Sequence, residues 1–366
     1  MLILRKYHIK YLLLILLTIN PFDKTMAQEK TKNLFVYVSL RNNNEIAVYK
    51  MNPSGSKLEL VEKLPVAGGP APMGLDPTNN FLYAGQRETN TLSSFRIDRH
   101  TGRLSLINSI AAADNMAYVA TDRTGRYLLT AYYASGKAAA YHIGPGSVLQ
   151  EPAIFILTDY VNAHSILTDP ANKFAFIADK GGDKIYQYKF DVNTGNLSPN
   201  DPPAVITATG TEPRHFVFHG SKDIVYFVNE TNNTVTAYHF DKEKGTLSPF
   251  QNISTIPGSF KEFTKTADIH LTPDNKFLYV SNRGHESIAA YKVDPSTGGL
   301  TLIDFFPTEV NPRSFAIDPG GNYLFCAGET SNNLAYYKID RENGRLEKID
   351  SFYAGEVPSW VLAIGL

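Results

Sequence analysis

The chain has 366 residues, of which 43% are apolar, 12% aromatic and 19% charged, as is usual for a folded globular protein. Its formal net charge is −1 and it contains no long run of Lys or Arg, so binding to nucleic acid or to a charged membrane surface is not expected. This length often means two or three domains, but a repeated architecture can be larger, so internal repeats are sought first.

The N-terminus has the three-part pattern of a secretory signal peptide. Basic residues precede an apolar run over residues 11–17, Pro21 ends the run, and Ala27 offers a small residue at a cleavage point. We expect residues 1–27 to be removed and the protein to be exported, to the periplasm or beyond, with no stable membrane insertion afterwards. The alternative is an uncleaved membrane anchor, although the apolar run is short for a spanning helix. Removing four Lys or Arg and one Asp changes the net charge from −1 to −4.

A short apolar strand with a central aromatic or aliphatic residue recurs seven times in the remaining chain. The central residues are Tyr37, Tyr83, Leu129, Phe176, Tyr226, Tyr279 and Phe325. Their spacings are 46, 46, 47, 50, 53 and 46 residues. A period near 46 with several strands in each repeat predicts the blades of a β-propeller. Residues 28–366 are therefore expected to form one all-β, seven-bladed domain.

Each repeat is expected to contribute four antiparallel strands. The first two are joined by tight turns such as those at residues 76–79, 169–172 and 318–321, where Pro, Asn and Gly favour the required backbone conformations. These turns are read as structural. The first repeat lacks its opening strand, and residues 359–364 resemble such a strand. Pairing this segment with residues 35–38 would close the ring and remove an open sheet edge.

Cys326 is the only cysteine, so no intramolecular disulfide can form. It lies within an apolar strand pattern. We expect a buried, inert thiol and not a nucleophile.

The topology locates a candidate site at one mouth of the central channel. Because the chain reverses direction at each turn, the start of the innermost strand and the end of the second strand lie on the same face. The residues at the strand starts are Ala71, Ala117, His164, Arg214, Ala267 and Arg313. Those after the second strands are Arg41, Arg87, Tyr133, Lys180, Glu230, Arg283 and Glu329. A mainly cationic cluster at a narrow opening suits a small anionic molecule.

Not all of these residues need a functional role. Taken singly, the loop residues Arg41, Arg87, Lys180 and Glu329 are read as solvated side chains. The strand starts are more enclosed, so a site role is favoured for His164, Arg214, His215 and Asp268. Asp268 and His270 share a strand face but lack a third ligand, so no metal is expected, and no cofactor is implied.

Four segments resemble the seven-bladed lactonase family, which includes bacterial propeller-type 6-phosphogluconolactonases and fungal 3-carboxy-cis,cis-muconate cyclases. They read HSILTDPANKFAFIADKGGDKI from His164, EPRHFVFH and YFVNETNNTV from Glu212 onward, ADIHLTPDNKFLYVSNRGHESIAAY from Ala267, and PRSFAIDPGGNYLF from Pro312. The resemblance extends from about Leu34 to the C-terminus. It implies that His164, Arg214, Glu230 and Arg283 are catalytic. Substrate-binding candidates at the same mouth are His215, Asp268, Arg313, Arg87 and Tyr133.

The resemblance implies that the protein is a hydrolase that opens a sugar-type lactone. Arg214 or Arg283 would stabilise the carbonyl oxygen, and the other would hold an anionic tail. His164 is preferred to Glu230 as the base, because nearby arginines oppose raising the pKa of a carboxyl group. Both arginines are expected near the surface, where replacing them should leave folding nearly intact.

Three questions remain open at this stage. The same groups could catalyse lactonisation, as in the cyclases. A non-catalytic binding propeller in the cell envelope is a rival from another class. Export also argues against a cytoplasmic phosphorylated lactone as the substrate, so the resemblance defines the fold and the site more closely than the lactone. The oligomeric state is not predicted.

Overall fold

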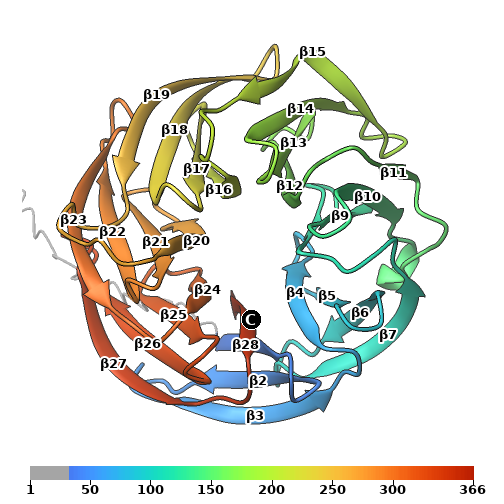
Figure 1. The fold of residues 1–366 in the computed structure, drawn as a ribbon. Coiled ribbons are helices and arrows are strands. Elements are labelled where there is room, and N and C mark those ends of the chain that lie inside the picture. Colours follow the sequence, from blue (N-terminus) through green and yellow to red (C-terminus); the bar gives the residue numbers. More distant parts are fainter. Residues whose placement is uncertain (1–32) are drawn as a thin grey trace, which may run out of the picture. The chain divides into compact units, whose positions relative to one another are not determined.

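Short apolar strands separated by polar turns organise residues 33–366, the part of the chain that the computed structural model describes. These residues form seven four-stranded antiparallel sheets, or blades, arranged in a ring (Figure 1). The prediction of an all-β, seven-bladed propeller is confirmed. The predicted signal peptide lies outside the described residues. Within residues 33–366, no helix is long and apolar enough to cross a membrane.

Within each blade, the four strands lie side by side, from the innermost strand beside the central channel to the outermost strand (Figure 1). Blade 1 contains β28 (Pro358–Gly365), β1 (Leu34–Leu40), β2 (Glu45–Met51) and β3 (Leu58–Pro65). Blade 2 contains β4 (Pro70–Leu75), β5 (Phe81–Gln86), β6 (Thr91–Ile97) and β7 (Leu104–Ala111). Blade 3 contains β8 (Tyr118–Thr121), β9 (Tyr127–Tyr132), β10 (Lys137–His142) and β11 (Phe155–Leu157), with the short 3₁₀ helix η1 (Pro145–Ser147) before β11.

The other four blades are regular. Blade 4 contains β12 (Ala163–Thr168), β13 (Phe174–Asp179), β14 (Lys184–Phe190) and β15 (Leu197–Ile206). Blade 5 contains β16 (Pro213–Phe218), β17 (Ile224–Asn229), β18 (Thr234–Asp241) and β19 (Thr246–Ser254). Blade 6 contains β20 (Lys265–Leu271), β21 (Phe277–Arg283), β22 (Ser287–Val293) and β23 (Leu300–Pro307). Blade 7 contains β24 (Pro312–Ile317), β25 (Tyr323–Gly328), β26 (Asn333–Ile339) and β27 (Leu346–Tyr353).

The C-terminal strand closes the ring, as predicted. β28 pairs antiparallel with β1, with Leu362 opposite Tyr37 and Gly365 opposite Leu34. In Figure 1 the last strand lies at the inner edge of the sheet formed by the first three. The opening strand that the first repeat lacks is thus supplied by the chain end, and β1 has no exposed edge toward the channel.

The hydrophobic core lies between the blades. Seven clusters of buried residues each combine side chains of two adjacent blades. In three blades the recurring residue of the second strand is a tyrosine whose hydroxyl group bonds the neighbouring blade. Tyr37 donates to the carbonyl of Gly102 at 2.8 Å, and Tyr279 donates to that of Gly344 at 2.9 Å. Cys326 is fully buried in the same core, where burial raises the pKa of its thiol to about 12, as expected for an inert cysteine.

The turns between the first two strands are structural, as the sequence indicates. In blade 4, Oδ1 of Asp169 accepts hydrogen bonds from the backbone N–H groups of Lys173 and Phe174, both at 2.7 Å. Its Oδ2 accepts another from Ala171 at 2.9 Å. Asn172 adopts φ of 58°, a left-handed conformation that Asn tolerates.

Candidate active site

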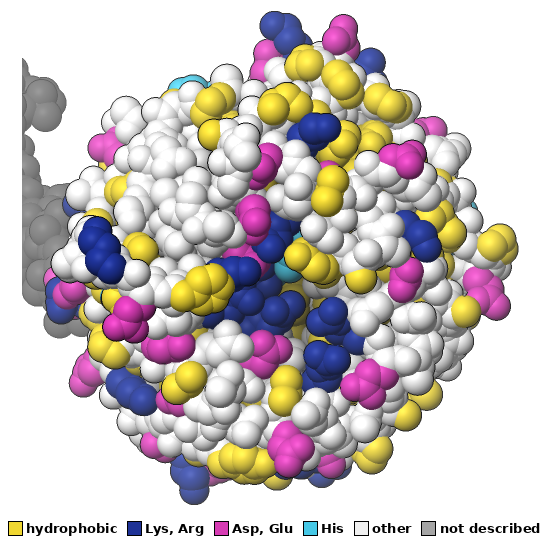
Figure 2. Space-filling view, in the orientation of Figure 1, with side chains coloured by type: hydrophobic (Ala, Val, Ile, Leu, Met, Phe, Trp, Pro, Cys, Tyr) yellow, Lys and Arg dark blue, Asp and Glu magenta, His cyan; other side chains and the backbone are white. Residues whose placement is uncertain are grey.

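Strand pairing brings the predicted residues to one mouth of the channel. Lys265 at the start of β20 lies opposite Arg283 at the end of β21, and Pro213 lies opposite Asn229 in the same way. Arg214, which follows Pro213, and Glu230, which follows Asn229, therefore lie close together at the mouth of the channel. Figure 2 shows Lys and Arg side chains gathered around the hollowed centre of this face.

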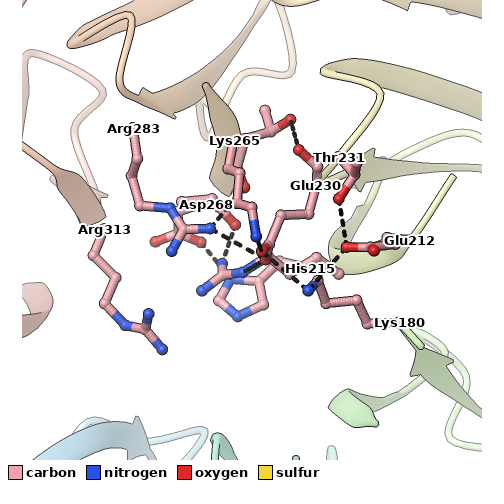
Figure 3. Close-up of polar contacts among 12 residues, drawn as sticks. Lys180, Glu212, His215, Glu230, Thr231, Lys265, Asp268, Arg283 and Arg313 are labelled. Carbon is pink, nitrogen blue, oxygen red and sulfur yellow. Dashed lines mark hydrogen bonds and ion pairs between the residues drawn. The ribbon is translucent and has the colours of Figure 1, made fainter. Parts of the chain in front are cut away.

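Glu230, directly after β17, is the centre of a charged cluster (Figure 3). Its Oε2 lies 2.9 Å from Nε of Arg214 and 3.1 Å from Nη2 of Arg283. Its Oε1 lies 3.1 Å from Nζ of Lys180 and 3.6 Å from Nζ of Lys265. One carboxylate thus holds cations from blades 4, 5 and 6 in fixed positions.

Burial in this cluster exceeds what the sequence indicated. Arg214, expected near the surface, is 1% exposed, because it lies one residue inside β16 and Nη1 donates to the carbonyl of Ala267 on the next blade. Lys180, read as a solvated loop residue, is 7% exposed. Its long side chain turns inward because both Glu230 and Glu212, 2.9 Å from its Nζ, attract it. Both expectations were wrong. Arg283 agrees better than Arg214 with the expected position at the rim of the channel, because 15% of its side chain is exposed.

The charges determine the protonation of this cluster. Burial alone would raise the pKa of Glu230, but Arg214, Arg283 and Lys180 together lower it to about 2. Burial, with the like charges of Arg283 and Arg313, lowers the pKa of Arg214 to about 9. At neutral pH Glu230 is therefore ionised and the arginines remain charged. Glu230 is an organiser of cations and a poor proton acceptor.

His164, at the start of β12, lies beside this cluster with 5% of its surface exposed. Its ring meets those of Tyr133 and His215 edge-on, at centroid distances of 5.6 and 5.1 Å. Its Nδ1 is buried without a hydrogen-bond partner among the described residues. Burial and the charge of Arg214 hold the pKa of His164 well below its usual range, so the imidazole is neutral at physiological pH.

His215 and Asp268 form a second buried pair. Nδ1 of His215 lies 2.8 Å from Oδ1 of Asp268, and Oδ2 of Asp268 accepts from the backbone N–H of Phe315 at 3.2 Å. Asp268 also contacts Nε2 of His270 at 3.3 Å. Burial and Arg214 lower the pKa of His215 to about 4. With a neutral imidazole and an ionised Asp268, Nδ1 is the protonated nitrogen.

Three rings divide the channel below these residues. His215 meets Tyr118 of β8 at 5.2 Å and Trp360 of β28 at 5.6 Å, and Tyr118 and Trp360 are 5.6 Å apart. Because the rings come from blades 5, 3 and 1, their contacts span the channel. A cavity of about 440 Å³ lies beyond them, toward Pro77 and the turns on the opposite face. The candidate site is thus a cup with an aromatic floor.

The remaining predicted residues occupy the other half of the mouth. Nε of Arg313 lies 3.8 Å from Oε1 of Glu329, and Nε of Arg87 donates to Oδ1 of Asn115 at 2.6 Å. Arg41 lies 3.9 Å from the exposed Glu88. The structure therefore separates Arg87 and Arg313 from the ion pairs around Glu230.

Sequence reasoning missed a third ring of residues at this mouth. Lys265 and Glu212 belong to the charged cluster, Asn115 holds Arg87, and Nδ2 of Asn311 donates to Oε2 of Glu329 at 3.0 Å. Each stands two positions before a strand-start residue already identified. Taking the residue two positions before each strand-start residue would have identified them.

Comparison with known proteins agrees with this architecture. The family model described as "Lactonase, 7-bladed beta-propeller" matches residues 28–114 and 107–363. The chain belongs to this lactonase family. A 6-phosphogluconolactonase of Enterobacter sp. (strain 638) is 30% identical over 283 residues, which cover 77% of this chain and 84% of that protein.

Two further similarities of this lactonase-family chain are a shorter match and a structural one. A 6-phosphogluconolactonase of Pectobacterium carotovorum is 33% identical over 191 residues. That alignment covers 52% of this chain and 57% of the relative, so the matched part is little more than half of the relative's length. The structure of the periplasmic gluconolactonase of Pseudomonas aeruginosa superposes with a TM-score of 0.85 at 24% identity, covering 91% of this chain and 99% of that one. The latter similarity shows the fold alone.

Proposed function

We propose that this lactonase-family propeller hydrolyses a sugar-type lactone in the cup above the aromatic floor. The observation that carries the proposal is the arrangement around Glu230. Four cations from three blades are held at 2.9 to 3.6 Å from one carboxylate, beside a neutral, buried histidine. A preorganised positive site next to a proton acceptor is what ester hydrolysis by water requires.

In the proposed reaction, His164 accepts a proton from water while the water oxygen forms a bond to the lactone carbonyl carbon. The carbonyl oxygen gains the negative charge, and Arg283 stabilises it. The side chain of Arg283 is 15% exposed at the mouth, so part of its guanidinium group is accessible to a bound lactone. The ring C–O bond then breaks, and the proton on His164 passes to the departing alkoxide. The product is the open hydroxy acid.

The other charged residues position these groups. Arg214 is occupied by Glu230 and by the carbonyl of Ala267, so we assign it to holding Glu230 in place. Glu230 in turn orients Arg283. A base role for Glu230 is disfavoured because three neighbouring cations lower its pKa to about 2.

The test is ring opening by the purified protein. Sugar lactones with and without a phosphate group are incubated with the protein, and ¹H NMR follows the loss of lactone and the gain of hydroxy acid against buffer alone. We expect acceleration for at least one lactone, and incubation of the corresponding hydroxy acid shows whether lactonisation occurs. Rates equal to buffer for every lactone would overturn the proposal in favour of a binding propeller.

We also propose that the protein is exported. The support is the signal-peptide pattern of residues 1–27 together with a family match that begins at residue 28. N-terminal sequencing of protein from the native host should give Gln28 or a residue near it. An intact Met1 in the cytoplasmic fraction would refute export and would favour a phosphorylated metabolite as substrate.

A further inference from the structure

An exposed phenylalanine lies beside the charged cluster at the mouth of the channel. Phe263, two residues before β20, is 78% exposed, more than any other large apolar residue within residues 33–366. Nζ of Lys265 lies over its ring, 5.4 Å from the centroid, and the same Nζ lies 3.6 Å from Oε1 of Glu230. One ammonium group therefore links the ring to the carboxylate that organises the candidate site. Figure 2 shows apolar side chains beside the Lys and Arg side chains at this mouth.

The backbone around Phe263 is fixed although its side chain is exposed. Oγ1 of the next residue, Thr264, accepts a hydrogen bond from the backbone N–H of His285 at 3.2 Å. The carbonyl of Phe263 packs against Gly284 so closely that a Cβ added to Gly284 would clash with its oxygen. Gly284 directly follows Arg283, which stabilises the carbonyl oxygen in the proposed reaction. The segment that carries the exposed ring is therefore packed against the segment that carries this arginine.

The exposed ring of Phe263 has surface available for a ligand. Lys265 contacts the ring without covering it, since the residue remains 78% exposed. Covering an exposed aromatic ring with an apolar surface is favourable. A sugar lactone offers such a surface, because the C–H bonds on a face of its ring are weakly positive and complement the negative face of an aromatic ring.

We propose that Phe263 is a substrate-binding residue that covers one face of the lactone ring. This assignment rests on the proposed function and describes the substrate class more closely. A six-membered sugar lactone whose ring hydroxyl groups are all equatorial presents C–H bonds on both faces, whereas an axial hydroxyl group interrupts one face. Phe263 takes no part in the bond-breaking steps. It favours lactones whose ring face toward it carries no axial hydroxyl group.

The first experiment measures binding without hydrolysis. Isothermal titration with gluconolactam, in which N–H replaces the ring oxygen and the ring resists opening, compares wild-type protein with Phe263→Ala and Phe263→Tyr. The control is Leu106→Ala, which removes an apolar side chain that is 60% exposed on β7, the outermost strand of blade 2. We expect affinity to fall by about 3- to 10-fold in Phe263→Ala, the scale of one aromatic contact, and to change little in the other two variants.

Two results of this titration would overturn the proposal. One is the same lactam affinity in all four proteins, or binding by none of them. The other is a change in oligomeric state of Phe263→Ala, measured by light scattering, with unchanged lactam affinity. In that case the exposed ring contacts a second copy of the chain and not the substrate.

The second experiment measures kcat and KM for three δ-lactones. Gluconolactone has equatorial ring hydroxyl groups, while mannonolactone and allonolactone each carry one axial hydroxyl group, on opposite faces of the ring. Phe263→Ala should raise KM for gluconolactone and for one of the other two by about 3- to 10-fold, with little change in kcat. KM for the remaining lactone should not change, because its axial hydroxyl group already prevents the contact.

The kinetic result also separates this assignment from the proposed hydrolysis. Equal effects of Phe263→Ala on all three lactones, or no effect on any, would overturn the role of Phe263 while hydrolysis stands. If wild-type protein opens no lactone yet binds gluconolactam through Phe263, the proposed hydrolysis fails while Phe263 remains a ring-binding residue.

Discussion

Arg283 and Arg214 both touch Oε2 of Glu230, but their surroundings give them different expected effects. Arg214 is 1% exposed, so replacing it with a smaller residue would leave a buried cavity and an incompletely neutralised Glu230. Loss of activity in that variant would then include damage to the fold. Arg283, at the end of β21, is the better probe because its side chain is 15% exposed.

We expect Arg283→Ala to lower kcat/KM by about 100-fold or more, the scale found when one transition-state donor is lost. The unfolding midpoint should change little. The control is Lys222→Ala, which removes a partly exposed charge whose Nζ donates to the carbonyl of Ser296 on the opposite face. Steady-state kinetics on all three proteins checks the prediction. Equal activities would place the site elsewhere or identify the propeller as a binder.

The pH dependence of catalysis tests the role of His164. A base must be unprotonated, and burial together with Arg214, His215, Arg313 and Arg283 keeps the pKa of His164 well below 6.5. Activity should therefore stay level as pH falls from 8 to 6.5 and decline only at lower pH, when the imidazole takes up a proton. Initial rates across this range measure the profile. An acid limb centred near 6.5 would contradict this protonation state, and an unaltered profile in His164→Gln would exclude His164 as the base.

At the level of the structural elements, the turn before the outermost strand of blade 2 packs against blade 1. Gly102 has φ of 73°, its carbonyl accepts the hydrogen bond from Tyr37, and a Cβ added there would lie 2.3 Å from Cδ1 of Phe35. Replacing it affects both the backbone of blade 2 and its contact with blade 1.

Gly102→Ala should therefore destabilise the protein by more than the 1–2 kcal/mol that a left-handed backbone costs, roughly, for a residue with a side chain. Gly146→Ala is a matched control, since Gly146 has φ of 71° but an added Cβ would meet no atom within 4 Å. Chemical denaturation of both variants measures the free energy of unfolding. Equal losses would mean that the backbone alone, and not the contact with Phe35, requires glycine at position 102.

The regular elements were predictable because each repeat carries local signals. The predicted closing strand over residues 359–364 lies within β28, and the Asp-Pro turns mark where the first two strands meet. The mouth of the channel was predictable for a related reason, since strand direction alone determines which residues share a face. His164, Arg214, Glu230 and Arg283 could be placed there without any contact being known.

Burial and pairing at the mouth could not be predicted in the same way. They depend on how far a side chain reaches toward another blade. Lys180 follows a strand of blade 4, yet its partner Glu230 is on blade 5. The aromatic floor formed by Tyr118, His215 and Trp360 joins three blades that no local pattern connects. Such contacts follow from the curvature of the ring and not from the repeat.

For the molecule as a whole, closure of the ring couples the chain ends to the site. β28 contributes the inner strand of blade 1, and Val361 is buried in the cluster that joins blades 1 and 7. The same strand carries Trp360 of the aromatic floor and Ser359, which donates to Glu329 at 3.4 Å. Losing it would open a sheet edge and remove part of the floor at once.

Deleting residues 358–366 should therefore destabilise all of residues 33–357, because β1 loses its partner on the channel side and the clusters that join blade 1 to blades 2 and 7 lose Val361 and Ile364. A milder truncation, of residues 365–366, removes the end of the pairing with Leu34 and Asn33 and the partly buried side chain of Leu366, and should melt close to the full chain. Thermal unfolding followed by circular dichroism compares the three proteins. We expect one cooperative transition in each and a clearly lower midpoint only for the longer deletion. If that deletion melts with the full chain, the C-terminal strand does not stabilise the ring.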